Sequence, residues 1–138
     1  MNFNITTSDE EDVKQFLHEL KNVLISENFN VDTDLDILAK KKNESPTDPY
    51  TTGNTMLSLN LDREDVRDEL LKLSTEDYYE TFIDDKDNTL PPFFAFTKNV
   101  KSKDVYIKVK IRDKKNYKIF CVSFHFPRYI LHAKPYKV

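Results

Sequence analysis

Near the end of the chain, a small set of polar side chains has the types and spacing needed for proton transfer beside a bound anion. Tyr106 and Lys108 are two residues apart in DVYIKVKI, and Ser123 and His125 are two residues apart in KIFCVSFHF. Histidine titrates closest to neutral pH, so it can act as a base or as an acid. Lysine can hold phosphate charge, and a tyrosine hydroxyl can donate a hydrogen bond or orient a neighbour.

Both segments alternate apolar and polar residues, which predicts two β-strands whose polar side chains share one face. With the turn at 113–116, the register places Tyr106 opposite Ser123 and Lys108 opposite Cys121. A slip by one residue would put the lysines in the core, so the pattern favours one register. The face expected to be buried in this hairpin carries Val105, Ile107, Val109, Phe120, Val122 and Phe124.

Upstream of the hairpin, the sequence predicts mainly helical structure over 9–82, after a frayed terminus at 1–8. Residues 9–26 begin with a capping serine or aspartate and an acidic first turn, and their apolar residues recur at helical spacing. Asp62 is expected to cap a second helix, because Asp65 occupies the capping-box position.

Two shorter stretches have distinct signals. Ser74 begins a second Ser-x-x-acid cap, which predicts a short helical turn carrying Tyr78, Tyr79 and Phe82. The segment LDILAKKK is compatible with either a short helix or a strand.

The order of these elements predicts an α+β fold, with N-terminal helices packed on a C-terminal antiparallel β-sheet. We expect a single domain over 1–138, with three or four strands within 93–131 and a basic tail at 132–138. Pro91 and Pro92 end an acidic loop just before the sheet.

The composition argues against several classes of protein. Cys121 is the single cysteine, so an internal disulfide and a zinc finger are both excluded. Gly53 is the single glycine, so the chain has no glycine-rich phosphate loop. No apolar run approaches the length of a membrane span, and the N-terminus is acidic, so we expect a cytoplasmic protein without membrane contact. We expect no metal and no cofactor.

The charge is distributed unevenly along the chain. Residues 96–138 hold twelve of the 21 Lys and Arg residues but only two of the 24 Asp and Glu residues. This asymmetry predicts a basic surface for a polyanion. The alternative is that outward-facing lysines only keep a sheet edge soluble.

Two motifs together resemble the MqsR family of bacterial type II toxins, which belong to the RelE-like fold group. They are LNLDREDVRDELLKLSTEDYY at 59–79 and DVYIKVKI…CVSFH at 104–125, and the resemblance covers residues 55–128. PYTTGNTML, PPFFAF and FPRY are similar to segments of low-GC Gram-positive members.

The resemblance implies a metal-independent, sequence-selective mRNA endoribonuclease that a cognate antitoxin neutralises. The family's functional Tyr and Lys in Val-Tyr-x-Lys match Tyr106 and Lys108. The family has lysine after Val-Ser-Phe, where this chain has His125, and after Asp-Tyr-Tyr, where this chain has Glu80. The first difference keeps a group that can transfer protons. The second reverses the charge, so Glu80 is either a base or lies outside the site.

Metal-free RNA cleavage requires a base for the 2′-hydroxyl, a cation or donor for the phosphorane, and an acid for the leaving 5′-oxygen. We assign these catalytic roles to His125, Tyr106 and Lys108, without deciding which group is the base and which the acid. The residues expected to bind RNA phosphates are Lys98, Lys110, Arg112 and Arg128. Further candidates are Glu80, Tyr79, which could stack on a base, and Ser123.

Each of these assignments has an alternative. A lone histidine on a strand is often only structural, and tyrosine can simply cover a sheet. The rival functions are a non-catalytic RNA-binding module and a protein-interaction module on the same fold. RNA binding without cleavage would indicate the first rival, and binding to a protein but not to RNA would indicate the second.

Overall fold

A single β-sheet runs through the molecule and supports every other element, which confirms the expected α+β class. The computed structural model describes residues 3–138. The strand order in the sheet is β1–β3–β4–β5–β6–β2, and all neighbours are antiparallel except β6 and β2. The strands are β1 (Phe3–Thr6), β2 (Leu35–Ile37), β3 (Tyr78–Asp84), β4 (Phe93–Val100), β5 (Lys103–Asp113) and β6 (Lys118–His125). The helices are α1 (Glu10–Ile25), α2 (Val31–Asp34), α3 (Thr52–Leu59) and α4 (Arg63–Leu71).

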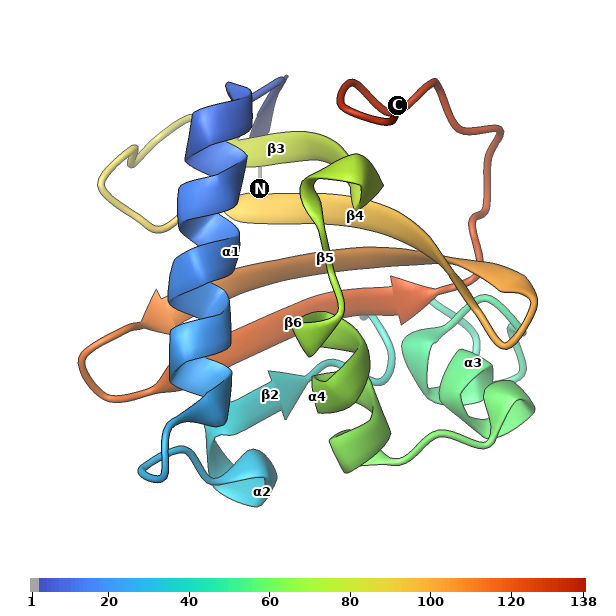
Figure 1. The fold of residues 1–138 in the computed structure, drawn as a ribbon. Helices are drawn as coiled ribbons and strands as arrows, with labels where there is room; N and C mark the ends of the chain where they lie inside the picture. Colours follow the sequence, from blue (N-terminus) through green and yellow to red (C-terminus); the bar gives the residue numbers. More distant parts are fainter. Residues whose placement is uncertain (1–2) are drawn as a thin grey trace.

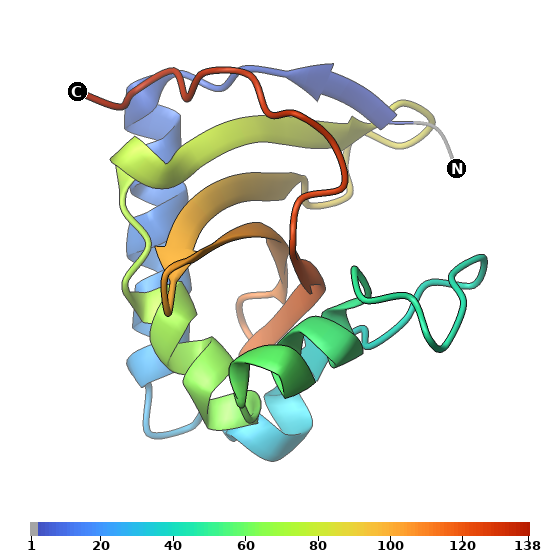
Figure 2. The same cartoon turned by 90° about the vertical axis from the view of Figure 1, so that its right-hand side faces the viewer.

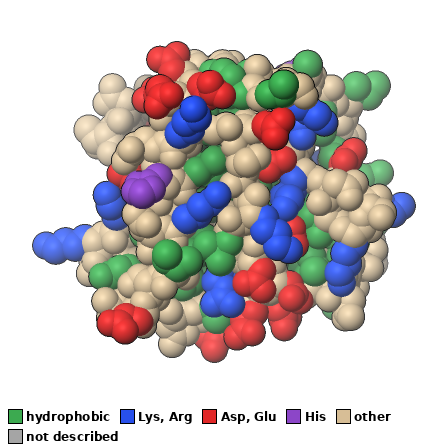
Figure 3. Space-filling model, in the orientation of Figure 1, with side chains coloured by type: hydrophobic (Ala, Val, Ile, Leu, Met, Phe, Trp, Pro, Cys, Tyr) green, Lys and Arg blue, Asp and Glu red, His purple; other side chains and the backbone are tan. Residues whose placement is uncertain are grey.

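Helices α1 and α4 cover one face of the sheet (Figure 1). The buried stripe of α1 packs on β4, where the rings of Phe16 and Phe94 stack with centroids 4.0 Å apart. On the outside of this helical layer, acidic and basic side chains are interspersed (Figure 3). The opposite face of the sheet, the open face, has no helical cover. The C-terminal segment after β6 passes beside this face and then crosses to the side of α1, where the chain ends (Figure 2). The exposed strand residues of that face are therefore the ones free to form a site.

Helices α1 and α4 begin where the sequence predicts, whereas α2 and α3 were not predicted. α1 starts after Asp9 and has Glu10 in its acidic first turn. α4 has the expected capping box, in which the Asp62 side chain accepts from the Asp65 amide and the Asp65 carboxylate accepts from the Asp62 amide. Each exchange satisfies an amide that the helix itself leaves unpaired.

The stretch after Ser74 differs from the expectation of a helical turn carrying aromatic residues. Its capping box is present, but it opens only a 3₁₀ turn at Thr75–Asp77. Tyr78, Tyr79 and Phe82 lie in strand β3, so helical structure ends before residue 82. The reason is tertiary pairing: β3 lies between β1 and β4, and its aromatic and β-branched residues suit a strand.

The two edge strands of the sheet differ from the expectation: one was not predicted, and the other was only one of two alternatives. Residues 3–6, expected to be frayed, form β1, and the Phe3 ring packs edge-on against Phe82 and Phe93. The ambiguous segment LDILAKKK begins as β2, which pairs parallel with β6 through Leu35 and Ile119. Within residues 3–138 the sheet thus has six strands: three of them lie within 93–131, as expected, and β1, β2 and β3 are additional.

The β5–β6 hairpin has a different register from the one expected. Tyr106 pairs with His125 and Lys108 with Ser123, whereas Val109 already pairs with Cys121. Val122 is therefore an extra residue, a β-bulge that reverses the facing of the strand. Before the bulge, Ile119 and Cys121 are buried in the core, and Phe120 and Val122 lie on the outer face, the opposite of the expectation. After the bulge, Phe124 faces the core and His125 the outer face, as expected.

The last residues are not a free basic tail. No strand follows His125, although the sheet was expected to extend to 131. The segment ends against the core instead, where the ring of Tyr136 stacks on that of the buried Tyr78 with centroids 5.8 Å apart. The Lys134 ammonium donates to the Thr97 carbonyl at 3.0 Å.

The bulge predicts that truncating Ile119 destabilises the protein much more than truncating Val122, although both lie on β6. Ile119→Ala removes a side chain that is 1% exposed, so the free energy of unfolding should fall by about 2–5 kcal/mol. Val122→Ala, its matched control on the outer face, should lower it by less than about 1 kcal/mol. Urea unfolding of both variants measures the difference. A larger loss for Val122→Ala would show that the strand follows the unbulged register instead.

Candidate active site

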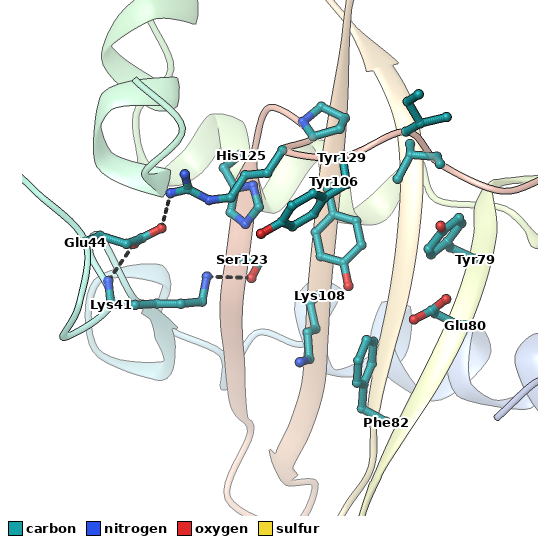
Figure 4. A pocket seen from close by; sticks show the side chains of 14 residues that line it. Lys41, Glu44, Tyr79, Glu80, Phe82, Tyr106, Lys108, Ser123, His125 and Tyr129 are labelled. Carbon is teal, nitrogen blue, oxygen red and sulfur yellow. Dashed lines mark hydrogen bonds and ion pairs between the residues drawn. The ribbon is translucent and has the colours of Figure 1, made fainter. Parts of the chain in front are cut away.

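The predicted catalytic residues converge on a pocket of about 410 Å³ on the open face of the sheet (Figure 4). β3, β5 and β6 form its floor. The loop after β2 and the segment after β6 form its walls. Of the residues expected in the site, the pocket includes Tyr79, Glu80, Tyr106, Lys108, Ser123, His125 and Arg128. It also includes Lys41, Glu44, Phe82 and Tyr129, which sequence reasoning did not select.

The β5–β6 pairing places the reactive groups next to one another. Tyr106 and His125 are direct cross-strand partners, and their rings stack with centroids 5.5 Å apart. Lys108 and Ser123 form the next pair on the same face. α3 holds the end of β6, because the Thr52 and Thr55 hydroxyls accept from the amides on either side of His125, those of Phe124 and Phe126.

One ring nitrogen of His125 is positioned to accept a proton. Its Nδ1 lies 2.9 Å from the Phe126 carbonyl oxygen, which can only accept, so Nδ1 carries the hydrogen. In the neutral ring, Nε2 then has a free lone pair. Burial lowers the pKa of His125 below its ordinary value, and the positive charges of Lys41 and Arg128 act in the same direction. The imidazole is therefore neutral at neutral pH.

The pKa of Lys108 is lowered and that of Tyr106 is raised, and burial is the main cause of both shifts. Burial lowers the pKa of Lys108 to about 8, and the neighbouring Lys41 adds to this effect. The Lys108 ammonium lies 3.7 Å from the centroid of the Phe82 ring, which stabilises the cation without a carboxylate partner. Burial and then the Glu80 charge raise the pKa of Tyr106, so its hydroxyl remains protonated and can donate.

Lys41 is the most informative residue that the sequence analysis missed. It belongs to the loop after β2, and its ammonium donates to the Ser123 hydroxyl at 3.0 Å. The run Lys40-Lys41-Lys42 was its only signal, and such a run is usually a solvated surface. Nothing in the sequence indicates which of the three lysines turns inward.

Glu80 lies at the pocket wall and is held by a second histidine. The Glu80 carboxylate is 2.8 Å from His132 Nε2, and His132 Nδ1 is 2.8 Å from the Ala133 carbonyl oxygen. Two acceptors face the two ring nitrogens, and the hydrogen bonds to Ala133 and Glu80 raise the pKa of His132, which favours the imidazolium. The ring also stacks on Tyr79 with centroids 3.8 Å apart, which leaves Tyr79 with one face covered.

The residues expected to bind phosphates are dispersed. Lys98 lies apart from the pocket and pairs with Glu69 of α4 at 3.0 Å. Lys110 and Arg112 lie outside the pocket, on the same face of the sheet. The Lys110 ammonium is 4.7 Å from the centroid of the Phe93 ring, and the Arg112 guanidinium carbon is 4.2 Å from that of Phe120. Arg128 is at the pocket wall, but it already pairs with Glu44 and Asp48.

Two further features bear on cofactors and the membrane. Within residues 3–138, no cluster of three or more His, Cys, Asp or Glu side chains is arranged to hold a metal ion. Over the same part of the chain, no helix is both long and apolar enough to cross a membrane.

Burial raises the pKa of the Cys121 thiol to about 12, so it is an inert core residue rather than a nucleophile.

A model of one known protein family matches most of the chain. The model of the family described as "Motility quorum-sensing regulator, toxin of MqsA" matches residues 32–126, which include every strand of the sheet except β1. No curated protein matches the chain.

The pKa of His125 should lie below the ordinary histidine pKa, and that of His132 above it. Nuclear magnetic resonance titration of the ring nitrogens should give a pKa below about 6.5 for His125 and above it for His132. Glu80→Gln should lower the pKa of His132, because it removes the carboxylate that stabilises the imidazolium, and should leave that of His125 unchanged. The reverse order of the two pKa values would contradict the hydrogen-bond assignment.

Proposed function

Because this chain belongs to the MqsR family, the toxin partners of toxin–antitoxin pairs, we propose that it is an endoribonuclease that cleaves mRNA without a metal ion. The observation that carries the proposal is one pocket that combines a neutral imidazole, a protonated phenol and a half-buried ammonium without a carboxylate partner. These are the groups that intramolecular cleavage of RNA requires. On this proposal the protein acts in the cytoplasm, and a cognate antitoxin neutralises it.

The first chemical step uses the free nitrogen of His125. Nε2 removes the proton of a ribose 2′-hydroxyl, and the oxygen forms a bond to the adjacent phosphorus. The Tyr106 hydroxyl, next to the imidazole and kept protonated by burial, donates a hydrogen bond to the phosphate. DNA lacks the 2′-hydroxyl, so the same pocket leaves DNA intact.

Lys108 completes the reaction as the acid. The bond from phosphorus to the 5′-oxygen breaks, and the ammonium transfers a proton to that oxygen. A pKa of about 8 keeps Lys108 protonated at neutral pH and still acidic enough to give up the proton. The products are a 2′,3′-cyclic phosphate and a 5′-hydroxyl, and solvent returns His125 and Lys108 to their starting protonation states.

We assign binding of the rest of the RNA to the face of the sheet beside the pocket. Lys108 and Lys110 both lie over the ring of Phe93 in an adjoining depression that also includes Phe120. Rings for stacking and cations for phosphates together fit single-stranded RNA. Lys98 is left out of this assignment because Glu69 neutralises it away from the pocket.

Cleavage of a defined transcript by purified protein in the presence of EDTA tests the proposal. The wild type should produce site-specific cuts with 2′,3′-cyclic phosphate ends. His125→Ala should slow single-turnover cleavage by about 10²–10⁴-fold, because it removes the base. Tyr106→Phe should slow it less and leave RNA binding intact. RNA that is bound but uncut across a broad pH range would instead support the non-catalytic RNA-binding module.

The pH dependence of cleavage separates the base from the acid. The rate should rise with pH as His125 loses its proton, below about pH 6.5, and should fall above about pH 8 as Lys108 loses its proton. Lys108→Arg should lower the rate and remove the basic limb, because a guanidinium stays protonated throughout this range. It should leave the acidic limb in place. A basic limb that persists in Lys108→Arg would show that another group is the acid.

A further inference from the structure

The loop that follows β2 carries a lysine whose ammonium is turned into the pocket. Three contacts fix the start and the turn of this loop. The Leu38 amide donates to the Cys121 carbonyl at 3.1 Å, the Gly53 amide donates to the Ala39 carbonyl at 2.8 Å, and the Lys41 amide donates to Glu44 Oε1 at 2.8 Å. Lys41 is thus held in place by its backbone, and its side chain is free to reach across to β6.

The three lysines of the loop have different surroundings. The Lys40 ammonium donates to the carbonyls of Lys41 and Glu44 and caps the loop from the solvent side. Lys42 is exposed at the surface. Only Lys41 is among the residues that line the pocket, where its ammonium donates to the Ser123 hydroxyl at 3.0 Å (Figure 4).

Lys41 and Lys108 meet at the same point of the sheet. Ser123, the hydrogen-bond partner of Lys41, is the cross-strand neighbour of Lys108. Within residues 3–138, neither ammonium forms an ion pair with a carboxylate at 4 Å or less. Burial lowers the pKa of both lysines, and the charge of Lys41 further lowers that of Lys108. Two partly dehydrated cations that repel each other form a place where an anion is stabilised.

We propose that Lys41 and the Ser123 hydroxyl form the phosphate-binding site of the pocket, with Lys41 as the catalytic cation that stabilises the phosphorane. This rests on the proposed ribonuclease function and adds a residue to it. Lys41 donates one hydrogen to Ser123 Oγ and keeps two for phosphate oxygens, and the Ser123 hydroxyl keeps its own hydrogen to donate.

The division of labour between the two lysines follows from their surroundings. Lys108 lies over the Phe82 ring and has the pKa of an acid that works near neutral pH. Lys41 donates to a hydroxyl, which accepts a hydrogen bond without removing the proton, so we assign Lys41 the role of the fixed cation rather than the acid. A phosphorane carries more negative charge than the phosphodiester, so Lys41 should stabilise the transition state more than the bound substrate.

Single-turnover cleavage by Lys41→Met, with Lys42→Met as the matched control, tests the proposal. Lys41→Met should slow cleavage at saturating protein by about 100-fold or more, and Lys42→Met by less than about 3-fold. The Kd for an RNA with a 2′-deoxy nucleotide at the cleavage site should rise by less than about 10-fold in Lys41→Met, because the lost contact is strongest in the transition state. Lys41→Arg should restore part of the rate. Equal rates for Lys41→Met and Lys42→Met would overturn the assignment.

A second measurement does not depend on cleavage. Titration of the wild type with inorganic phosphate, followed by nuclear magnetic resonance, should shift the side-chain signals of Lys41 and the amide signal of Ser123. Lys41→Met should abolish the shift at Ser123, whereas Lys42→Met should preserve it. Absence of these shifts in the wild type would reject the phosphate site. Phosphate shifts in a wild type that leaves RNA intact would support the site and reject the ribonuclease function, so the two failures are distinguishable.

Discussion

The pairing of β5 with β6 is the interaction on which the rest of the structure depends. It joins the two strands that carry the reactive side chains, and it lies between the β4 side of the sheet and the parallel strand β2. The extra residue Val122 changes the facing of β6 halfway along its length. One strand can therefore bury Ile119 and Cys121 near its start and still present Ser123 and His125 to the pocket near its end.

The sequence predicted the parts of this fold that depend on local chemistry. Acidic first turns and the exchange between Asp62 and Asp65 act within a few residues, so α1 and α4 were correctly placed. The segment around Tyr78 was misplaced, because its helical cap is real but pairing with β1 and β4 decides the conformation of the residues that follow. Pairing partners distant in the sequence leave no such local signal.

The same distinction applies to the candidate site. Alternation and resemblance were enough to group Tyr106, Lys108 and His125, because all three lie on two adjacent strands. The bulge was not predicted, since Phe120, Val122 and Phe124 look like an uninterrupted apolar face. Lys41 was missed for a related reason: its position depends on the parallel pairing of the nearby strand β2 with β6, which is distant in the sequence.

That parallel pairing also affects when the pocket can form. Within residues 3–138, β6 is the one strand that pairs with β2, so the loop carrying Lys41 lacks its contacts with Cys121 and Ser123 until the last strand is in place. During synthesis on a ribosome, residues 35–45 emerge before residues 118–125 and cannot pair with them until those are made. Contacts between residues so far apart in the sequence also form slowly. The wall of the pocket is thus among the last parts of the molecule to assemble, and an incomplete nascent chain lacks it.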